Sequence, residues 1–129
     1  MKKLIRTIAA AAILFTSPLA AQDSNDCVTH DWGKLTSLGD IGLRFTNNCQ
    51  WDVDVHWVDN EFGRRICGRS LQKGIGIRSG DNYTTLLLGM KDVAKPLVVW
   101  CADASRRDHP DYNTCRQLRA KPISNAVDC

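Results

Sequence analysis

The sequence lacks any apolar run long enough to cross a membrane, and it offers little to support hydrolytic chemistry. Its signal-like apolar run, Ile8 to Phe15, is far shorter than the ~20 residues that a membrane helix needs. Glu61 is the only glutamate, and no serine lies in a Gly-x-Ser-x-Gly elbow. No cysteines have the Cys-x-x-Cys spacing of thioredoxin-type redox sites and zinc ribbons. We therefore predict no membrane span in the mature chain, no catalytic residue and no cofactor.

The chain also has no net charge once the expected leader is removed. The whole chain has 17 basic and 14 acidic residues, but three basic residues lie within the first 21 positions. A neutral mature chain gives no support for a nucleic-acid partner. The charge is unevenly spread, however: residues 22–62 hold eight acidic and two basic residues, whereas residues 63–129 hold six acidic and twelve basic ones.

The first 21 residues have the pattern of a secretory signal peptide. A basic start precedes the alanine-rich apolar run, then Ser17-Pro18 breaks it and Ala20-Ala21 supplies small residues for cleavage. We expect a secreted or periplasmic protein. Its residues 22–26 would form a polar N-terminal tail, and residues 27–129 a single disulfide-stapled domain.

The predicted domain contains an even number of cysteines. In a short exported chain such a set indicates three disulfides, each of which typically stabilises the fold by ~2–4 kcal/mol. Six cysteines allow fifteen pairings, and the sequence does not choose among them. The six are Cys27, Cys49, Cys67, Cys101, Cys115 and Cys129.

Short segments of alternating or β-branched residues recur at a spacing of about ten residues, with turn residues between them. They lie near 41–46, 50–59, 75–78, 83–88 and 97–101. This spacing predicts an all-β fold, a small antiparallel β-sandwich with three disulfides. A loop-rich C-terminal tail follows residue 101, with one or two helical turns within 114–120. The predicted core comprises Leu43, Phe45, Val53, Val55, Trp57, Val99 and Trp100.

Three stretches within residues 43–101, "LRFTNNCQWDVDVHW", "SLQKG" and "VVWCA", follow the order of motifs in small secreted β modules. The order is also similar to the opening strands of thaumatin-like proteins, over about half of the mature chain. The chain departs from that family in length, in cysteine count and in the acidic cleft. The resemblance therefore implies a β-sandwich and carries over no function.

The segment at 50–59 has two chemically different faces. Trp51, Val53, Val55 and Trp57 alternate with Asp52, Asp54 and His56. Since residues two apart share a face of a strand, the three polar side chains project together, as metal ligands could. No further ligands are identifiable from the sequence. We favour a solvated face whose charge is neutralised by Arg44 on the adjacent strand.

Two other segments are candidate binding surfaces. If Cys101 pairs with Cys115, the disulfide closes the loop at 102–114 and restricts its conformation. Such a loop could bind a protein partner through its exposed side chains, which are Arg106, Arg107, Asp108, His109 and Tyr112. The basic stretch at 64–78, with Arg64, Arg65 and Arg69, could bind an anionic glycan.

From these features we expect an exported, non-catalytic binding module that recognises a protein or an anionic glycan. The alternatives are a small secreted hydrolase that uses a histidine–aspartate pair and a metal-binding protein. The hydrolase requires a histidine and an acid within hydrogen-bond reach. The metal-binding protein requires His56 to meet at least three donor groups.

Overall fold

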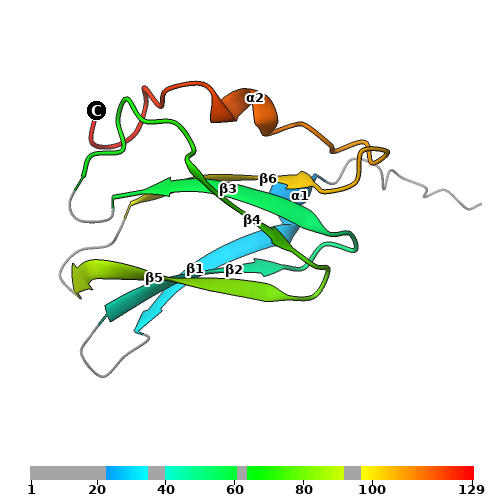
Figure 1. Ribbon diagram of the computed structural model, residues 1–129, viewed down its shortest axis with the longest axis horizontal. Coiled ribbons are helices and arrows are strands. Elements are labelled where there is room, and N and C mark those ends of the chain that lie inside the picture. Colours follow the sequence, from blue (N-terminus) through cyan, green and yellow to red (C-terminus); the bar gives the residue numbers. More distant parts are fainter. Residues whose placement is uncertain (1–22, 35–39, 61–63, 92–96) are drawn as a thin grey trace, which may run out of the picture.

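Two antiparallel three-stranded sheets pack face to face in the part of the chain that the structure describes (Figure 1). The computed structural model describes residues 23–34, 40–60, 64–91 and 97–129, so the predicted signal peptide lies outside it. One sheet has the order β1-β2-β5, formed by Val28–Lys34, Asp40–Asn47 and Asn82–Lys91. The other has the order β4-β3-β6, formed by Lys73–Ile77, Val53–Asp59 and Val98–Ala104. The prediction of a small all-β fold is confirmed.

The main core lies between the two sheets and follows the alternation of the strands. Leu43 and Phe45 of β2 and Val53, Val55 and Trp57 of β3 are buried there. In the β3–β6 register Trp57 pairs with Trp100, and the rings of Trp57 and Trp100 lie 5.3 and 5.7 Å from the Phe45 ring. All seven predicted core residues pack in hydrophobic clusters. Val99, however, faces the opposite side of β6, because neighbouring strand residues point to opposite faces.

The start of the described chain is more ordered than a polar tail. Asp23 caps a short helix, α1 (Ser24–Cys27), by accepting hydrogen bonds from the backbone N–H groups of Asn25 and Asp26. Ser24 is fully buried. Strand β1, which follows directly, was not predicted, although Val28, His30 and Trp32 alternate with smaller or polar residues as in other half-buried strands.

The C-terminal residues 105–129, here called the C-terminal cover, lie over the outer face of the β4-β3-β6 sheet (Figure 1). The cover contains α2 (Arg116–Arg119), which matches the helical turns predicted within 114–120. A second hydrophobic cluster forms beneath the cover from buried residues of both sheet and loops: Val58, Ile66, Leu71, Cys101 and Cys115. Leu97, Val99, Ile123 and Ala126 pack against it.

Disulfides attach the cover at two points. Cys101–Cys115 joins it to β6, and Cys67–Cys129 joins its end to the segment before β4. Beside the second bridge, Gly68 N–H donates to the Ile123 carbonyl and Ile123 N–H donates to the Arg69 carbonyl. The third disulfide, Cys27–Cys49, links α1 to the turn after β2. Among the described residues, no helix is long and apolar enough to cross a membrane.

Candidate functional site

The polar face of β3 points toward the C-terminal cover. Asp52 is exposed, Asp54 is half-buried and His56 is only 7% exposed. Ser79 N–H donates to Asp52 at 3.0 Å, and the Ser105 hydroxyl donates to Asp54 at 2.9 Å. The prediction of a solvated face is therefore wrong for His56, because the cover closes over the part of the sheet where this residue lies.

Arg44 does not neutralise these aspartates. It belongs to β2 of the other sheet, where its guanidinium binds the carboxylate of Asp31 at 2.9 Å across the β1–β2 pair. The hydrogen bond from Arg44 holds the pKa of Asp31 below its ordinary value. The expected pairing failed because the next strand in the sequence is not a neighbour of β3 in its sheet.

His56 and Asp103 are two buried polar residues that lie near each other beneath the cover. The β3–β6 register places Asp103 opposite Asp54, two residues from His56 on the same outward face. Asp103 Oδ1 accepts from the Thr114 hydroxyl at 2.8 Å and from Cys115 N–H at 2.6 Å. Within the described structure, Asp103 Oδ2 and His56 Nδ1 are buried without a hydrogen-bond partner.

The electrostatics of His56 follow from this burial. Desolvation is the main reason why the pKa of His56 lies below its ordinary value, and the charges of Arg119 and Arg116 add to the decrease. Asp103 and Asp54 oppose it. Space around the ring is also limited, since a Cβ on Gly74 would lie 2.9 Å from His56 Nδ1.

The donor groups do not converge as the metal alternative requires. Among the described residues, the only three metal-ligating side chains whose donor atoms lie within 4.8 Å of one another are Cys67, Asp128 and Cys129. Both cysteines are in a disulfide, and Asp128 accepts hydrogen bonds from the backbone. His56 Nδ1 has no hydrogen-bond partner among the described residues, and His109 Nδ1 accepts from Asp111 N–H, so neither nitrogen is bonded to a carboxylate.

The loop at 102–114 is closed by Cys101–Cys115, and most of its candidate side chains contact other side chains of the protein. Arg106 binds Asp108 at 2.8 Å, which is the main reason why the pKa of Asp108 is lowered. The His109 ring lies 4.4 Å from the Trp51 ring, and its Nδ1 accepts from Asp111 N–H. The Tyr112 ring lies 4.5 Å from the Arg116 guanidinium. Arg107 is exposed.

The basic stretch at 64–78 divides into two parts. Arg69 is half-buried and donates to the Asp59 carbonyl and to Gln72, and Lys73 forms an ion pair with the buried Asp59 carboxylate at 3.1 Å. These two cations stabilise the end of β3. Arg64 and Arg65 are exposed, and neither makes an ion pair or hydrogen bond with the described residues.

Three further exposed cations lie on the C-terminal cover. Arg116, Arg119 and Lys121 are exposed and have no carboxylate partner in the described part of the chain. We call these three residues, together with Arg64 and Arg65, the cover-face cations. Sequence reasoning did not join them, because the Cys67–Cys129 pairing, which links the segment after Arg65 to the end of the cover, was not known. The run "RQLRAK" was the available signal.

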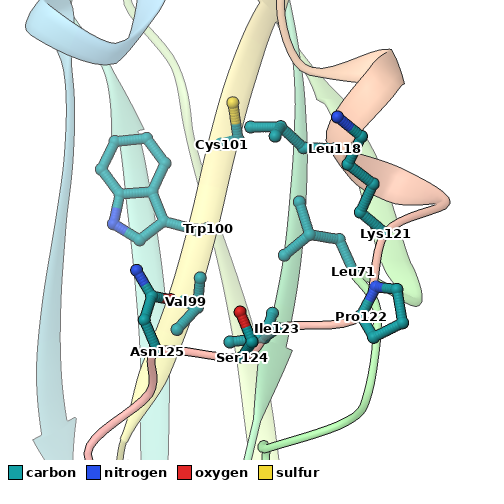
Figure 2. Close-up of a pocket in the computed structure, with 10 residues that line it drawn as sticks. All are labelled: Leu71, Val99, Trp100, Cys101, Leu118, Lys121, Pro122, Ile123, Ser124 and Asn125. Carbon is teal, nitrogen blue, oxygen red and sulfur yellow. The ribbon is translucent and has the colours of Figure 1, made fainter.

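A cavity of about 290 Å³ opens between the cover and the outer face of β6 (Figure 2). Leu118 and Lys121 border it from the cover, and Leu71 borders it from the segment before β4. Its complete lining is Leu71, Val99, Trp100, Cys101, Leu118, Lys121, Pro122, Ile123, Ser124 and Asn125.

These features define a disulfide-stabilised β-sandwich with a covered outer face and a basic surface on that cover. No protein-family model matches the sequence, and no curated protein or solved structure matches it significantly. The similarity to thaumatin-like proteins therefore rests only on the short stretches within 43–101.

Proposed function

We propose that the protein is an exported, non-catalytic binding module that recognises an anionic partner through the cover-face cations. Three disulfides are compatible with folding in an oxidising compartment, and the N-terminal sequence supports export to the periplasm or beyond. Two of these bridges attach the cover to the sandwich and restrict the conformations that it can adopt. A surface that is ordered in advance loses less entropy on binding.

The observation that carries this proposal is that the carboxylates near the cover have partners within the protein, whereas the cover-face cations have no carboxylate partner among the described residues. The described carboxylates there accept internal hydrogen bonds: Asp103 from Cys115 N–H, Asp111 from Ser24 N–H and Asp128 from Ile66 N–H. The cover-face cations lack carboxylate partners in the same region. Positive charge therefore remains available on this face, which favours a negatively charged partner.

The loop at 102–114 supports a protein partner less well. Its Arg106–Asp108 pair is internally neutralised, and His109 and Tyr112 contact neighbouring side chains. The loop is thus held against Trp51 and against Arg116 of α2, and Ser24 N–H of α1 donates to its Asp111. They account for its presence without an external partner.

Retention on a sulfated-polysaccharide resin tests the proposal. The disulfide-bonded protein is expected to bind at low salt, and the variant Arg64→Ala with Arg65→Ala to elute at clearly lower salt, because surface attraction is screened by ions. Arg119→Ala should act in the same direction. Arg44→Ala is the matched control, since it removes one exposed cation from the other sheet. Equal elution of Arg119→Ala and Arg44→Ala, with an unchanged double variant, would refute the role of the cover face.

A further inference from the structure

The cavity beside the cover-face cations has an aliphatic lining. Leu71 and Ile123 belong to the outer hydrophobic cluster, and Val99 points outward from β6 to meet them. The Trp100 ring packs against Phe45 in the main core instead, and in Figure 2 it lies on the side of β6 away from Leu71 and Leu118. The cavity therefore offers aliphatic contacts and no aromatic platform from this indole.

Polar groups lie at two separate places on the margin of the same cavity: in Figure 2 the Lys121 ammonium lies beside Leu118, whereas Ser124 and Asn125 lie at the other end. Lys121, Ser124 and Asn125 supply an ammonium, a hydroxyl and an amide (Figure 2). Leu118 also borders the cavity and is 47% exposed, between the cationic neighbours Arg116 and Arg119 on α2. An apolar interior thus adjoins a margin that carries donors and positive charge.

We infer that this cavity binds a single-chain aliphatic carboxylate, with the chain against Leu71, Val99 and Ile123 and the carboxylate at Lys121. The inference rests on the proposed function, because it names the kind of anion that the basic face would recognise. Charge complementarity selects the carboxylate, and the aliphatic lining selects the chain. A sugar buried here would leave hydroxyl groups short of partners, which costs free energy.

The size of the cavity limits the ligand further. About 290 Å³ lies just below the range of ~300–1,000 Å³ that is typical of small-molecule sites. This volume suits one short chain and excludes the simultaneous burial of two long ones. We therefore expect affinity to rise with chain length only until the chain fills the cavity.

A homologous series of straight-chain carboxylates from butanoate to dodecanoate, kept below micelle-forming concentrations, tests the inference by isothermal titration calorimetry. Each methylene that enters the cavity should lower the Kd about fourfold, and the gain should stop at an intermediate length. Straight-chain alcohols of equal length are the matched ligands without charge. They should follow the same length dependence with weaker affinity.

Two exposed positions provide variants that should still fold. Leu118→Ala should raise the Kd roughly fivefold for the longer carboxylates, because part of the chain loses its contact. Lys121→Gln should raise the Kd of the carboxylates roughly threefold and leave that of the alcohols unchanged. Val127→Ala is the control, since Val127 is 92% exposed and does not line the cavity.

The results of the titrations and of the resin experiment distinguish a failure of this inference from a failure of the proposed function. If no carboxylate binds, or the Kd does not depend on chain length, the inference is wrong even when retention on the sulfated resin persists. If alcohols bind as tightly as carboxylates and Lys121→Gln has no effect, the cavity binds chains without selecting an anion, which overturns the inference. Loss of resin retention together with anion-independent chain binding would overturn the proposed function as well.

Discussion

The two hydrophobic clusters of this protein are assembled in different ways. The cluster between the sheets comes from paired strands, with the rings of Phe45, Trp57 and Trp100 in mutual contact. The cluster outside the β4-β3-β6 sheet combines strand residues with loop residues such as Ile66 and Leu71. Its cover has little regular structure and is attached by two disulfides. Regular pairing builds the first cluster, and covalent links hold the second in place.

This difference has an energetic consequence. The outer cluster borders the cavity, and the buried His56 and Asp103 each have an unpartnered polar atom beneath the cover. A side chain beside a cavity makes fewer packing contacts, and an unpartnered polar atom opposes burial. We therefore expect the cover to be the less stable of the two regions, and the following experiments test that comparison.

Truncation of one large residue in each cluster should give the largest contrast. Phe45→Ala should lower the free energy of unfolding by about 3–5 kcal/mol, since Phe45 is fully buried between the sheets. Leu71→Ala should cost about 2 kcal/mol, near the low end for such changes, because Leu71 already borders a cavity. Urea unfolding followed by circular dichroism gives both values. A Leu71→Ala cost equal to that of Phe45→Ala would remove the proposed difference between the clusters.

The disulfides of the cover should rank by the length of chain that they close. Replacement of Cys67 and Cys129 by serine opens a separation of 62 residues and should cost about 4 kcal/mol. The same change at Cys101 and Cys115 opens a separation of 14 residues and should cost about 3 kcal/mol.

Hydrogen exchange should also show where the first of these changes acts. In the Cys67→Ser/Cys129→Ser variant, the amides of Gly68 and Ile123 should lose protection while those of β2 and β3 retain theirs. Uniform loss across both sheets would show instead that the cover and the sandwich unfold as one unit.

The inner cluster could be predicted because its information is local. Alternation in 41–46 and 50–59 identified Leu43, Phe45, Val53, Val55 and Trp57, and the structure buries all five. Strand β1 carries the same kind of alternation and could have been recognised. The predicted polar tail covered only residues 22–26, and the segment after it was given no strand assignment.

The outer face could not be predicted in the same way. The alternation of residues predicts that Asp54 and His56 share a face of the strand, but it does not predict which segment of the chain covers that face. The cover reaches them through long-range links: Cys115 to Cys101, Cys115 N–H to Asp103 and Cys129 to Cys67. With fifteen possible pairings, the sequence alone could not reveal that the segment of Arg64 is linked to the cover that carries Lys121.

A methyl group at Gly74 should destabilise the covered face specifically. The new Cβ would lie 2.9 Å from His56 Nδ1, so Gly74→Ala should cost about 1–3 kcal/mol through displacement of the ring. Gly33→Ala is the matched control in strand β1, where a Cβ would meet nothing within 4 Å, and it should be neutral or slightly stabilising. Thermal unfolding of both variants makes the comparison. Equal effects would show that the ring of His56 is not confined by β4.

The smallest expected effect is the response of the covered face to pH. The pKa of His56 is lowered, mainly by burial, while the unfolded chain keeps the ordinary value near 6.5. Above this pH neither state binds the proton, so the contribution of neutral His56 to stability is complete. As the pH falls below 6.5, the unfolded state gains a proton that the folded state resists, and the free energy of unfolding decreases. For one group this decrease cannot exceed about 1.4 kcal/mol per pH unit.

Urea unfolding of the wild type and His56→Gln at pH 7.5, 6.5 and 5.5 isolates this titration, since both proteins keep His30 and His109. The wild type should lose stability relative to the variant on acidification. Because Cys115 N–H donates to Asp103 beside His56, its amide should lose exchange protection before the amides of β2 do. Parallel loss of stability in the two proteins would exclude His56 as the titrating group. Loss of protection in β2 first would place the weak point between the sheets and reverse the comparison of the two clusters.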